Sequence, residues 1–223
     1  MKPWETLAHA TTPDGGAMRL SCRDGEYVIW VDGRSLMSSR AHGSEESLAE
    51  AGCGHLRGAA APRVLVGGLG MGYTLRAALD VLPADARVVV AELVPEVVTW
   101  NRDLLGALAG HPLRDTRVRV AVEDVGFTLR AHPRRFDAIL LDVDNGPAAF
   151  TAQLNNSLYS AQGLAAAHAS LVSGGVLAVW SAWDDDGFTR RLRSQGFTTQ
   201  SSRVRARQEK RGSHHTIFVG VKA

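Results

Sequence analysis

From residue 63 onward, short apolar runs rich in β-branched residues alternate with longer segments of mixed polarity. The short runs indicate buried strands, and the longer segments have the length and pattern of helices. We predict strands over 64–67, 88–92, 118–122, 138–142 and 176–181, and helices over 74–82, 95–105, 125–130, 160–171 and 187–194. Such alternation is typical of the α/β class, with a mostly parallel, twisted sheet and helices on both faces.

The C-terminal pattern differs, because strands over 198–205 and 215–221 are separated only by a polar, basic loop. A parallel pair needs a longer crossover, so the short connection predicts a C-terminal antiparallel hairpin. The preceding helix begins with Asp186 as its expected N-cap.

The N-terminal pattern predicts a small β-meander. After a loose lead-in over 1–15, strand-like runs cover 17–22 and 26–31, and a third strand is expected over 34–39. An Asp-Gly pair follows each of the first two runs, which is a strong hairpin signal. A helix over 44–51, capped by Ser44, then leads into a linker rich in glycine and alanine.

A glycine-rich turn links the first strand of the main pattern to the first helix. Gly68, Gly70 and Gly72 follow the strand, and glycine in such a turn lets the backbone approach a ligand. The next strand ends in Glu92, at the place where an acid can accept the two hydroxyls of a ribose. The order of strand, turn, helix, strand and acid favours a nucleoside-containing cofactor. The alternative is an ordinary βαβ unit with a solvated Glu92.

These features divide the chain into two parts. We expect residues 1–55 to form the meander with its linker helix, and residues 56–223 to form a Rossmann-like domain that binds a nucleoside-containing cofactor and carries any catalytic site.

Acidic residues follow two further strands. Glu123 and Asp124 come after the third strand, where a carboxylate can accept from the exocyclic amine of an adenine or cap the next helix. Asp142 ends a buried strand in the crevice region where open α/β sheets bind ligands. Asp144 lies two residues on, so the two acids point alike if the chain stays extended. Together they would hold a cationic amine, or one would take its proton, although Asp144 also suits a turn cap.

Composition excludes several classes. The net charge is +2, two cysteines match no zinc spacing, and the histidines show no spacing that calls for a metal. No apolar run approaches the roughly 20 residues that span a bilayer, and the first residues lack a signal-peptide core. We therefore expect a cytoplasmic protein without metal or membrane association. The basic cluster over 203–211 is expected to be a solvated loop, so nucleic acid is not the expected partner.

These stretches together resemble the spermidine synthase family, the aminopropyltransferases within the class I S-adenosylmethionine-dependent methyltransferase fold. The resemblance runs from about Tyr27 to Trp180. It implies cofactor contacts at Gly68, Gly70, Glu92 and Asp124, with Asp142 at the reaction centre. Met71, Gly72 and Glu123 complete the candidate cofactor site, and Asp144 is the second candidate catalytic acid.

The acceptor side of the resemblance includes Tyr159, since Leu158-Tyr159-Ser160 looks like the phenol-bearing segment after the family's catalytic loop. Trp183 is a candidate wall of the acceptor pocket. The chain also departs from the family. Met71 stands where the family's glycine turn carries an aspartate that grips the amino group of decarboxylated S-adenosylmethionine. Only an acid remains of the family's Tyr-His-Glu segment, near 43–46.

The resemblance implies a transferase that uses S-adenosylmethionine or its decarboxylated form to alkylate a small amine or similar nucleophile. Because of Met71, the sequence slightly favours methyl transfer. The alternatives are a genuine aminopropyltransferase of polyamine synthesis, a non-catalytic nucleoside-binding scaffold, and an RNA methyltransferase that uses the 203–211 loop. In the resembled family the N-terminal strands meet across a dimer, so a homodimer is expected.

Overall fold

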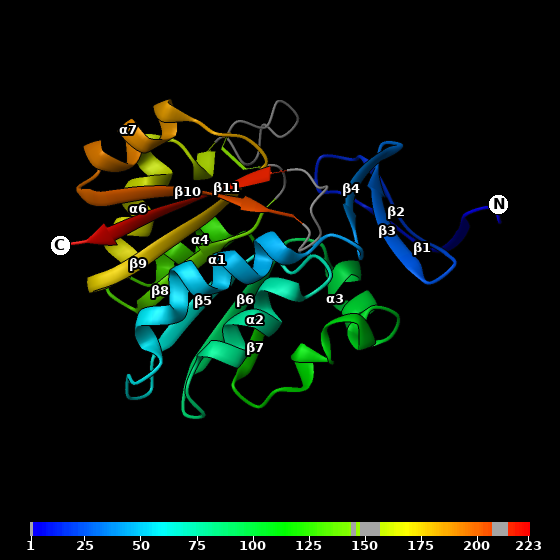
Figure 1. Cartoon of the computed structure of the whole chain (residues 1–223), viewed down its shortest axis with the longest axis horizontal. Coiled ribbons are helices and arrows are strands. Elements are labelled where there is room, and N and C mark those ends of the chain that lie inside the picture. Colours follow the sequence, from blue (N-terminus) through cyan, green and yellow to red (C-terminus); the bar gives the residue numbers. More distant parts are fainter. Residues whose placement is uncertain (1, 144–145, 148–156, 207–213) are drawn as a thin grey trace.

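A seven-stranded sheet forms the body of the protein (Figure 1). The computed structural model describes residues 2–143, 146–147, 157–206 and 214–223. The strand order is β10-β11-β9-β8-β5-β6-β7. In chain order the strands are β5 (Arg63–Gly67), β6 (Arg87–Glu92), β7 (Val118–Val122), β8 (Phe136–Leu141), β9 (Leu171–Ser181), β10 (Phe197–Arg205) and β11 (His214–Lys222). The predicted α/β class is confirmed.

The strands are parallel from β9 through β8, β5 and β6 to β7, while β11 pairs antiparallel with both β9 and β10. The predicted C-terminal antiparallel hairpin is therefore present. Because β5 lies between β8 and β6, the strands that follow β5 in the chain are added first on one side of it and later on the other. Ligands bind at such a switch point, outside the carboxyl ends of the strands.

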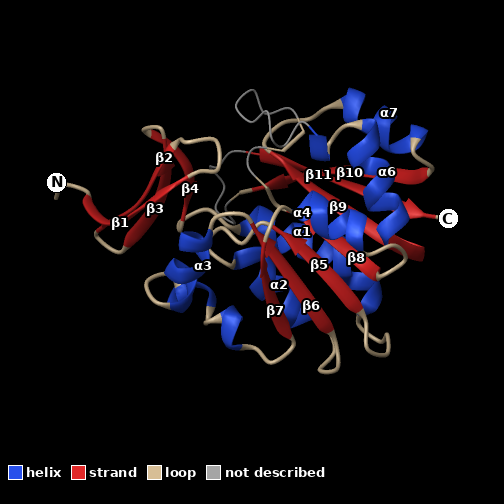
Figure 2. Cartoon of the chain, turned by 180° about the vertical axis from the view of Figure 1, so that it is seen from behind, coloured by secondary structure: helices blue, strands red, loops and turns tan. Residues whose placement is uncertain are grey.

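Helices cover both faces of this sheet (Figure 2). Side chains alternate along each strand, so Val64 and Val66 join one core while Leu65 between them joins the other. One face packs under α1 (Gly43–Cys53), α2 (Tyr73–Val81) and α3 (Pro95–Arg102), and the other under α4 (Val125–Ala131), α6 (Ala161–Ser170) and α7 (Asp186–Ser194). No helix within the described ranges is both long and apolar enough to cross a bilayer.

The N-terminal strands form a separate antiparallel sheet at one end of the molecule, the end at which α3 lies (Figure 1). Its strands, in the order β1-β2-β3-β4, are β1 (Glu5–Thr11), β2 (Ala17–Arg23), β3 (Glu26–Val31) and β4 (Arg34–Ser38). The meander is confirmed, but the prediction of a loose lead-in was wrong. Six residues of β1 pair with β2. This pairing adds a fourth strand in a segment whose sequence has no alternating pattern to predict one.

Helix α1 belongs with the main sheet rather than with the meander. It packs against α2 and against β9, β11 and β8, and its Leu48, Ala49 and Cys53 are fully buried. A division at residue 55 therefore cuts off a helix that completes one face of the main sheet.

Two predicted caps were wrong. Ser44 lies inside α1, where His42 takes the N-cap position, and its hydroxyl makes other hydrogen bonds that are described below. Helix α7 is capped by Asp185, whose carboxylate accepts from the Phe188 amide at 2.9 Å, and not by Asp186. Helix α3 also stops at Arg102, three residues before the predicted end, and a 3-10 helix over Gly106–Ala109 follows.

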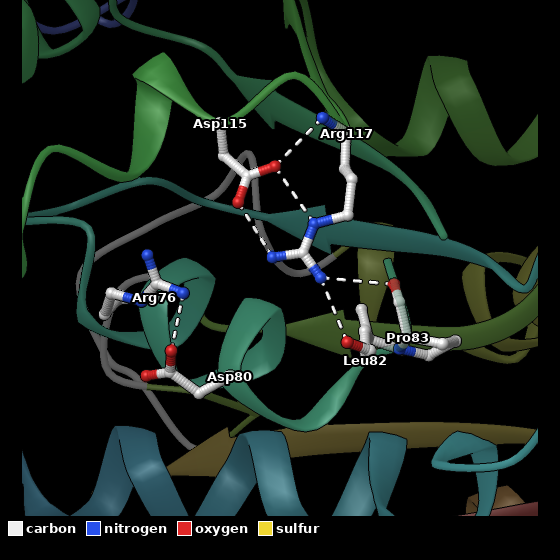
Figure 3. A network of polar contacts seen from close by, with 6 residues as sticks. All are labelled: Arg76, Asp80, Leu82, Pro83, Asp115 and Arg117. Atoms are coloured by element: carbon white, nitrogen blue, oxygen red, sulfur yellow. Dashed lines mark hydrogen bonds and ion pairs between the residues drawn. The ribbon is translucent and has the colours of Figure 1, made fainter. Parts of the chain in front are cut away.

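A polar network lies at the start of β7, the edge strand farthest from β10 in the main sheet (Figure 3). Arg117 pairs with Asp115 at 2.7 Å and donates to the carbonyls of Leu82 and Pro83 at 3.0 and 3.2 Å. The hydrogen bonds from Arg117 lower the pKa of Asp115 to about 2. Leu82, Asp115 and Arg117 line a hollow of about 530 Å³. Since their charges neutralise one another at the amino ends of the strands, we assign the network to stability.

Candidate functional site

The glycine turn brings the carboxyl ends of three strands together. The Gly68 amide donates to the Ala91 carbonyl at the end of β6, and the Asp142 amide donates to the Gly67 carbonyl at the end of β5. Gly68 has a φ of +87°, and a Cβ there would lie 2.3 Å from the carbonyl oxygen of Asp142. Only glycine fits this position, so the turn packs backbone against backbone between β6 and β8.

Glu92 holds the turn from the neighbouring strand. Its side chain is buried, and its two carboxylate oxygens accept the backbone amides of Leu69 and Val94, each at 2.9 Å. The structure therefore places Glu92 beside the turn, in contrast to the solvated side chain of the alternative interpretation.

Asn101 is a residue of this turn that the sequence did not reveal. It is buried on α3, and its amide nitrogen donates to the carbonyls of Gly70 and Val97 at 2.8 and 2.9 Å. It therefore ties the glycine turn to α3. Met37 of β4 also reaches the turn, because its sulfur would lie 2.9 Å from a Cβ on Gly70. The sequence gives no indication of these contacts, because neither an asparagine within a helix nor a methionine within the meander belongs to a recognisable motif.

The edge beyond Glu92 combines acids with exposed apolar side chains. Val122 lies directly opposite Glu92 in the ladder between β6 and β7. Leu93, Val122 and Phe127 are 38%, 53% and 56% exposed, although most large apolar side chains here are buried. Exposed apolar groups beside a nucleoside-type turn suit the faces of a flat base.

The two acids after β7 already have partners. Asp124 caps α4 by accepting the Phe127 amide at 3.0 Å, and the Thr128 hydroxyl donates to Glu123 at 2.6 Å. The cap alternative for Asp124 is thus present in the structure. Contact with a base stays a prediction for both residues.

Asp142 stands immediately beyond β8, beside the turn. Its Oδ2 accepts the hydroxyl of Thr74, at the start of α2, at 2.6 Å. Removal from water raises the pKa of Asp142 to about 6, although the Thr74 hydrogen bond acts in the opposite direction. A carboxyl group with a pKa near neutrality can exchange a proton with a ligand at physiological pH.

A second carboxyl group, Glu45 of α1, shares the environment of Asp142. Glu45 is only 7% exposed. Burial, followed by the charge of Asp142, raises its pKa to about 8. Burial and the charge of Glu45 raise the pKa of Tyr73 to about 12, and the Tyr73 ring stacks on His42 with 4.3 Å between the ring centroids. Glu45 was not among the predicted site residues, although the acid near 43–46 in the resembled acceptor segment was its signal.

Three candidate residues remain, namely Tyr159, Trp183 and Asp144. Tyr159 is buried against Phe188, and its hydroxyl reaches the carbonyl of Val143, the residue after Asp142, at 3.5 Å. Trp183 is 51% exposed and lines a hollow of about 320 Å³ beyond β9 and β11. Asp144 lies outside the described residues.

The side chain of Met71 is fully buried within the core formed with the face of α1, α2 and α3. Contact of Met71 with a cofactor stays a prediction. Gly72, with a φ of +84°, occupies the N-cap position of α2 and shapes the turn through its backbone.

The search for metal ligands concerns the described residues alone. Among them, no group of three or more His, Cys, Asp or Glu side chains is arranged to hold a metal ion.

The fold defines a class of protein: a mostly parallel α/β sheet with helices on both faces, a glycine-rich turn after β5 and an added N-terminal meander. Three solved structures are similar to the chain. A spermidine synthase in complex with the transition-state analogue AdoDATO has a TM-score of 0.75 at 17% identity, over 98% of this chain and 72% of that one. The spermidine synthase from Thermotoga maritima has a TM-score of 0.75 at 18% identity, over 98% and 73%. A probable spermidine synthase from Corynebacterium glutamicum has a TM-score of 0.70 at 16% identity, over 99% and 81%.

These similarities show that the chain has the spermidine synthase-like fold, which confirms the resemblance at the level of architecture. No protein-family model matches the sequence, and no curated protein matches it either.

Proposed function

We propose that the protein is a transferase of the spermidine synthase type, which moves an aminopropyl group from decarboxylated S-adenosylmethionine to a small amine. The observation that carries this proposal is the buried carboxyl pair of Glu45 and Asp142, placed next to a glycine turn that suits a nucleoside. Two acids that share a low-dielectric site favour a cation as their third partner, because they cannot both ionise at low cost without one.

The cofactor side of the proposal rests on the turn and on Glu92. The residues fit an adenosine-containing group, since Gly68 lets the backbone approach a ligand, Glu92 places a carboxylate beside the turn, and Leu93 and Val122 offer apolar faces. When bound, the sulfonium would supply an activated carbon to a nucleophile. The carboxyl pair would orient the acceptor amine, and Asp142 would take the proton that this amine releases.

The charge of the site also favours aminopropyl over methyl transfer. Met71 supplies no charge that would select either cofactor, so this choice rests on the carboxyl pair of Glu45 and Asp142. Buried carboxylates attract the ammonium group of the decarboxylated cofactor and repel the carboxylate of ordinary S-adenosylmethionine. The similarity to spermidine synthases supports the same choice.

The experiment that tests this proposal supplies the protein with decarboxylated S-adenosylmethionine and a linear diamine. Mass spectrometry should detect methylthioadenosine and the aminopropylated amine in equal amounts. A parallel reaction with S-adenosylmethionine should give no methylated amine. Methylated product without aminopropylated product would contradict the proposal.

The role of Glu92 leads to a prediction about affinity. Replacement by alanine should weaken binding of the decarboxylated cofactor by about 1.5–3 kcal/mol, the scale of a hydrogen bond to a charged group. Isothermal titration measures the change, and Glu96→Ala on the exposed first turn of α3 is the matched control. Thermal unfolding of the variant should accompany the titration, because Glu92 also holds Leu69 and Val94. Unchanged affinity in Glu92→Ala would refute the ribose assignment.

Association through the N-terminal sheet is a further proposal. A strand at the edge of a sheet has unpaired backbone groups, and β1 and β4 are the edges of this one. We expect a homodimer that uses these strands. Light scattering at high micromolar concentration should return twice the chain mass of 23.9 kDa, and a mass of one chain would exclude the dimer.

A further inference from the structure

A chain of hydrogen bonds leads from Glu45 to the C-terminal hairpin. The Ser44 hydroxyl donates to Oε2 of Glu45 at 2.6 Å, and Nδ1 of His215 lies 2.9 Å from the same hydroxyl oxygen. Ser44 is fully buried, and His215 comes from β11, 171 positions further along the sequence. The fold thus brings a histidine from its last strand to the first turn of α1.

The single hydrogen of Ser44 fixes the direction of this chain. A hydroxyl has one hydrogen and two acceptor directions. Since that hydrogen is on the Glu45 carboxyl, the contact with His215 requires the imidazole to donate from Nδ1 to Ser44 Oγ. The tautomer of His215 therefore determines whether Ser44 remains available as a donor to Glu45.

The surroundings keep His215 in place. Its ring packs against the ring of Trp180 in β9, with 4.6 Å between centroids and 68° between planes. Burial, and then the charge of His214, lower the pKa of His215. A neutral imidazole at neutral pH donates from one nitrogen, in agreement with the direction of the chain.

We propose that His215 is a positioning residue for Glu45 and that it acts through Ser44. By donating to Ser44, it directs the Ser44 hydroxyl onto the carboxyl group and holds that group beside Asp142. This inference extends the proposed function, because Glu45 is one of the two acids assigned to the acceptor amine. The Ser44 hydrogen bond lowers the pKa of Glu45 against the opposing effect of burial. His215 thereby makes the charged, amine-binding form more accessible.

Several other groups face this chain and contribute to its pH dependence. Asp142 and Glu46 raise the pKa of Glu45 through their charges, and Tyr73 faces Glu45 from α2. His214 faces His215, and the end of β10 meets the start of α1 through the Ala206 carbonyl. The test must therefore follow Glu45 directly rather than the pH dependence of the whole protein.

Carbon-13 NMR of the Glu45 carboxyl group in the full chain without cofactor gives this titration. Ser44→Ala should raise the pKa of Glu45 by about half a unit to one unit, the scale of one hydrogen bond. His215→Leu should raise it similarly, and the double variant should show no more than either single change. In His215→Asn the amide can donate from nearly the same place as Nδ1, and this variant should restore the parent value. His168→Leu, a histidine on the opposite face of the sheet, should have no effect.

Nitrogen-15 NMR of the parent protein provides a second test that needs no variant. His215 should carry its hydrogen on Nδ1 above about pH 8, where Glu45 is ionised and accepts the hydrogen of Ser44. The proposal fails if the hydrogen is on Nε2, or if His215→Leu leaves the pKa of Glu45 unchanged while Ser44→Ala raises it. Neither measurement requires transfer activity, so their failure is distinct from a failure of the proposed function.

Discussion

Replacement of Asp142 by asparagine should lower kcat for aminopropyl transfer by roughly 10²–10⁴-fold, the range typical of a lost general base. Asparagine has nearly the same shape, and its side-chain oxygen can still accept the Thr74 hydroxyl. It cannot take a proton from the acceptor amine. The loss should therefore fall on kcat, while the affinity for the decarboxylated cofactor changes by a few-fold at most. Single-turnover kinetics and isothermal titration separate the two effects.

Asp137→Asn is the matched control for this variant. Asp137 lies on the same strand at its amino end, where its carboxylate accepts the Arg63 amide at 2.7 Å. The substitution removes the same charge from β8 but far from the glycine turn, so kcat should stay close to that of the parent. An Asp142→Asn variant with at least a tenth of parental kcat would exclude Asp142 as the base.

Glu45→Gln should have two opposite effects, because a buried carboxyl group is unfavourable for folding and useful for binding a cation. The pKa of Glu45 rises from 4.5 to about 8 on folding, so the folded state binds more protons than the unfolded state between these values. The favourable contribution of the protonated Glu45 to the free energy of unfolding is fully present below about pH 4.5. It is lost as the pH rises through about 8. At pH 9 the glutamine variant should be more stable than the parent by on the order of 1–3 kcal/mol.

The same variant should bind the acceptor amine at least roughly tenfold more weakly, since a charge-assisted contact becomes a neutral one. Denaturant unfolding at pH 5, 7 and 9 and titration of a diamine into the cofactor-loaded protein measure the two effects. Glu50→Gln, an exposed position on the same helix, is the control. A parent whose stability does not fall between pH 5 and 9 relative to Glu45→Gln would show that Glu45 is not perturbed as described.

The sequence predicted the strands of the main sheet because their apolar runs report burial on two faces. It also placed the glycine turn, Glu92 and Asp142 at strand ends, where local pattern and chain order suffice, while their roles in binding stay predictions. It missed β1, because an edge strand with mostly polar, half-exposed residues has no clear period. It did not reveal that the Met71 side chain is fully buried, because a motif does not show which way one side chain of a turn points.

The acceptor side of the site was harder to predict than the cofactor side. Glu45, Ser44 and His215 meet only after α1 packs across the sheet and β11 adds to β9. Nothing in the local sequence distinguishes a buried glutamate on a helix from its exposed neighbour Glu46. Only the packing of α1 against the main sheet separates the two positions.

The most direct measurement of the central claim is isothermal titration of decarboxylated S-adenosylmethionine and of S-adenosylmethionine into the parent protein under identical conditions. The claim is that a nucleoside turn and a buried carboxyl pair together select a cationic aminopropyl donor. The decarboxylated form should bind at least roughly tenfold more tightly, because one carboxylate near buried acids costs about 1.4 kcal/mol or more. Tighter binding of S-adenosylmethionine, or binding of neither compound, would contradict the account.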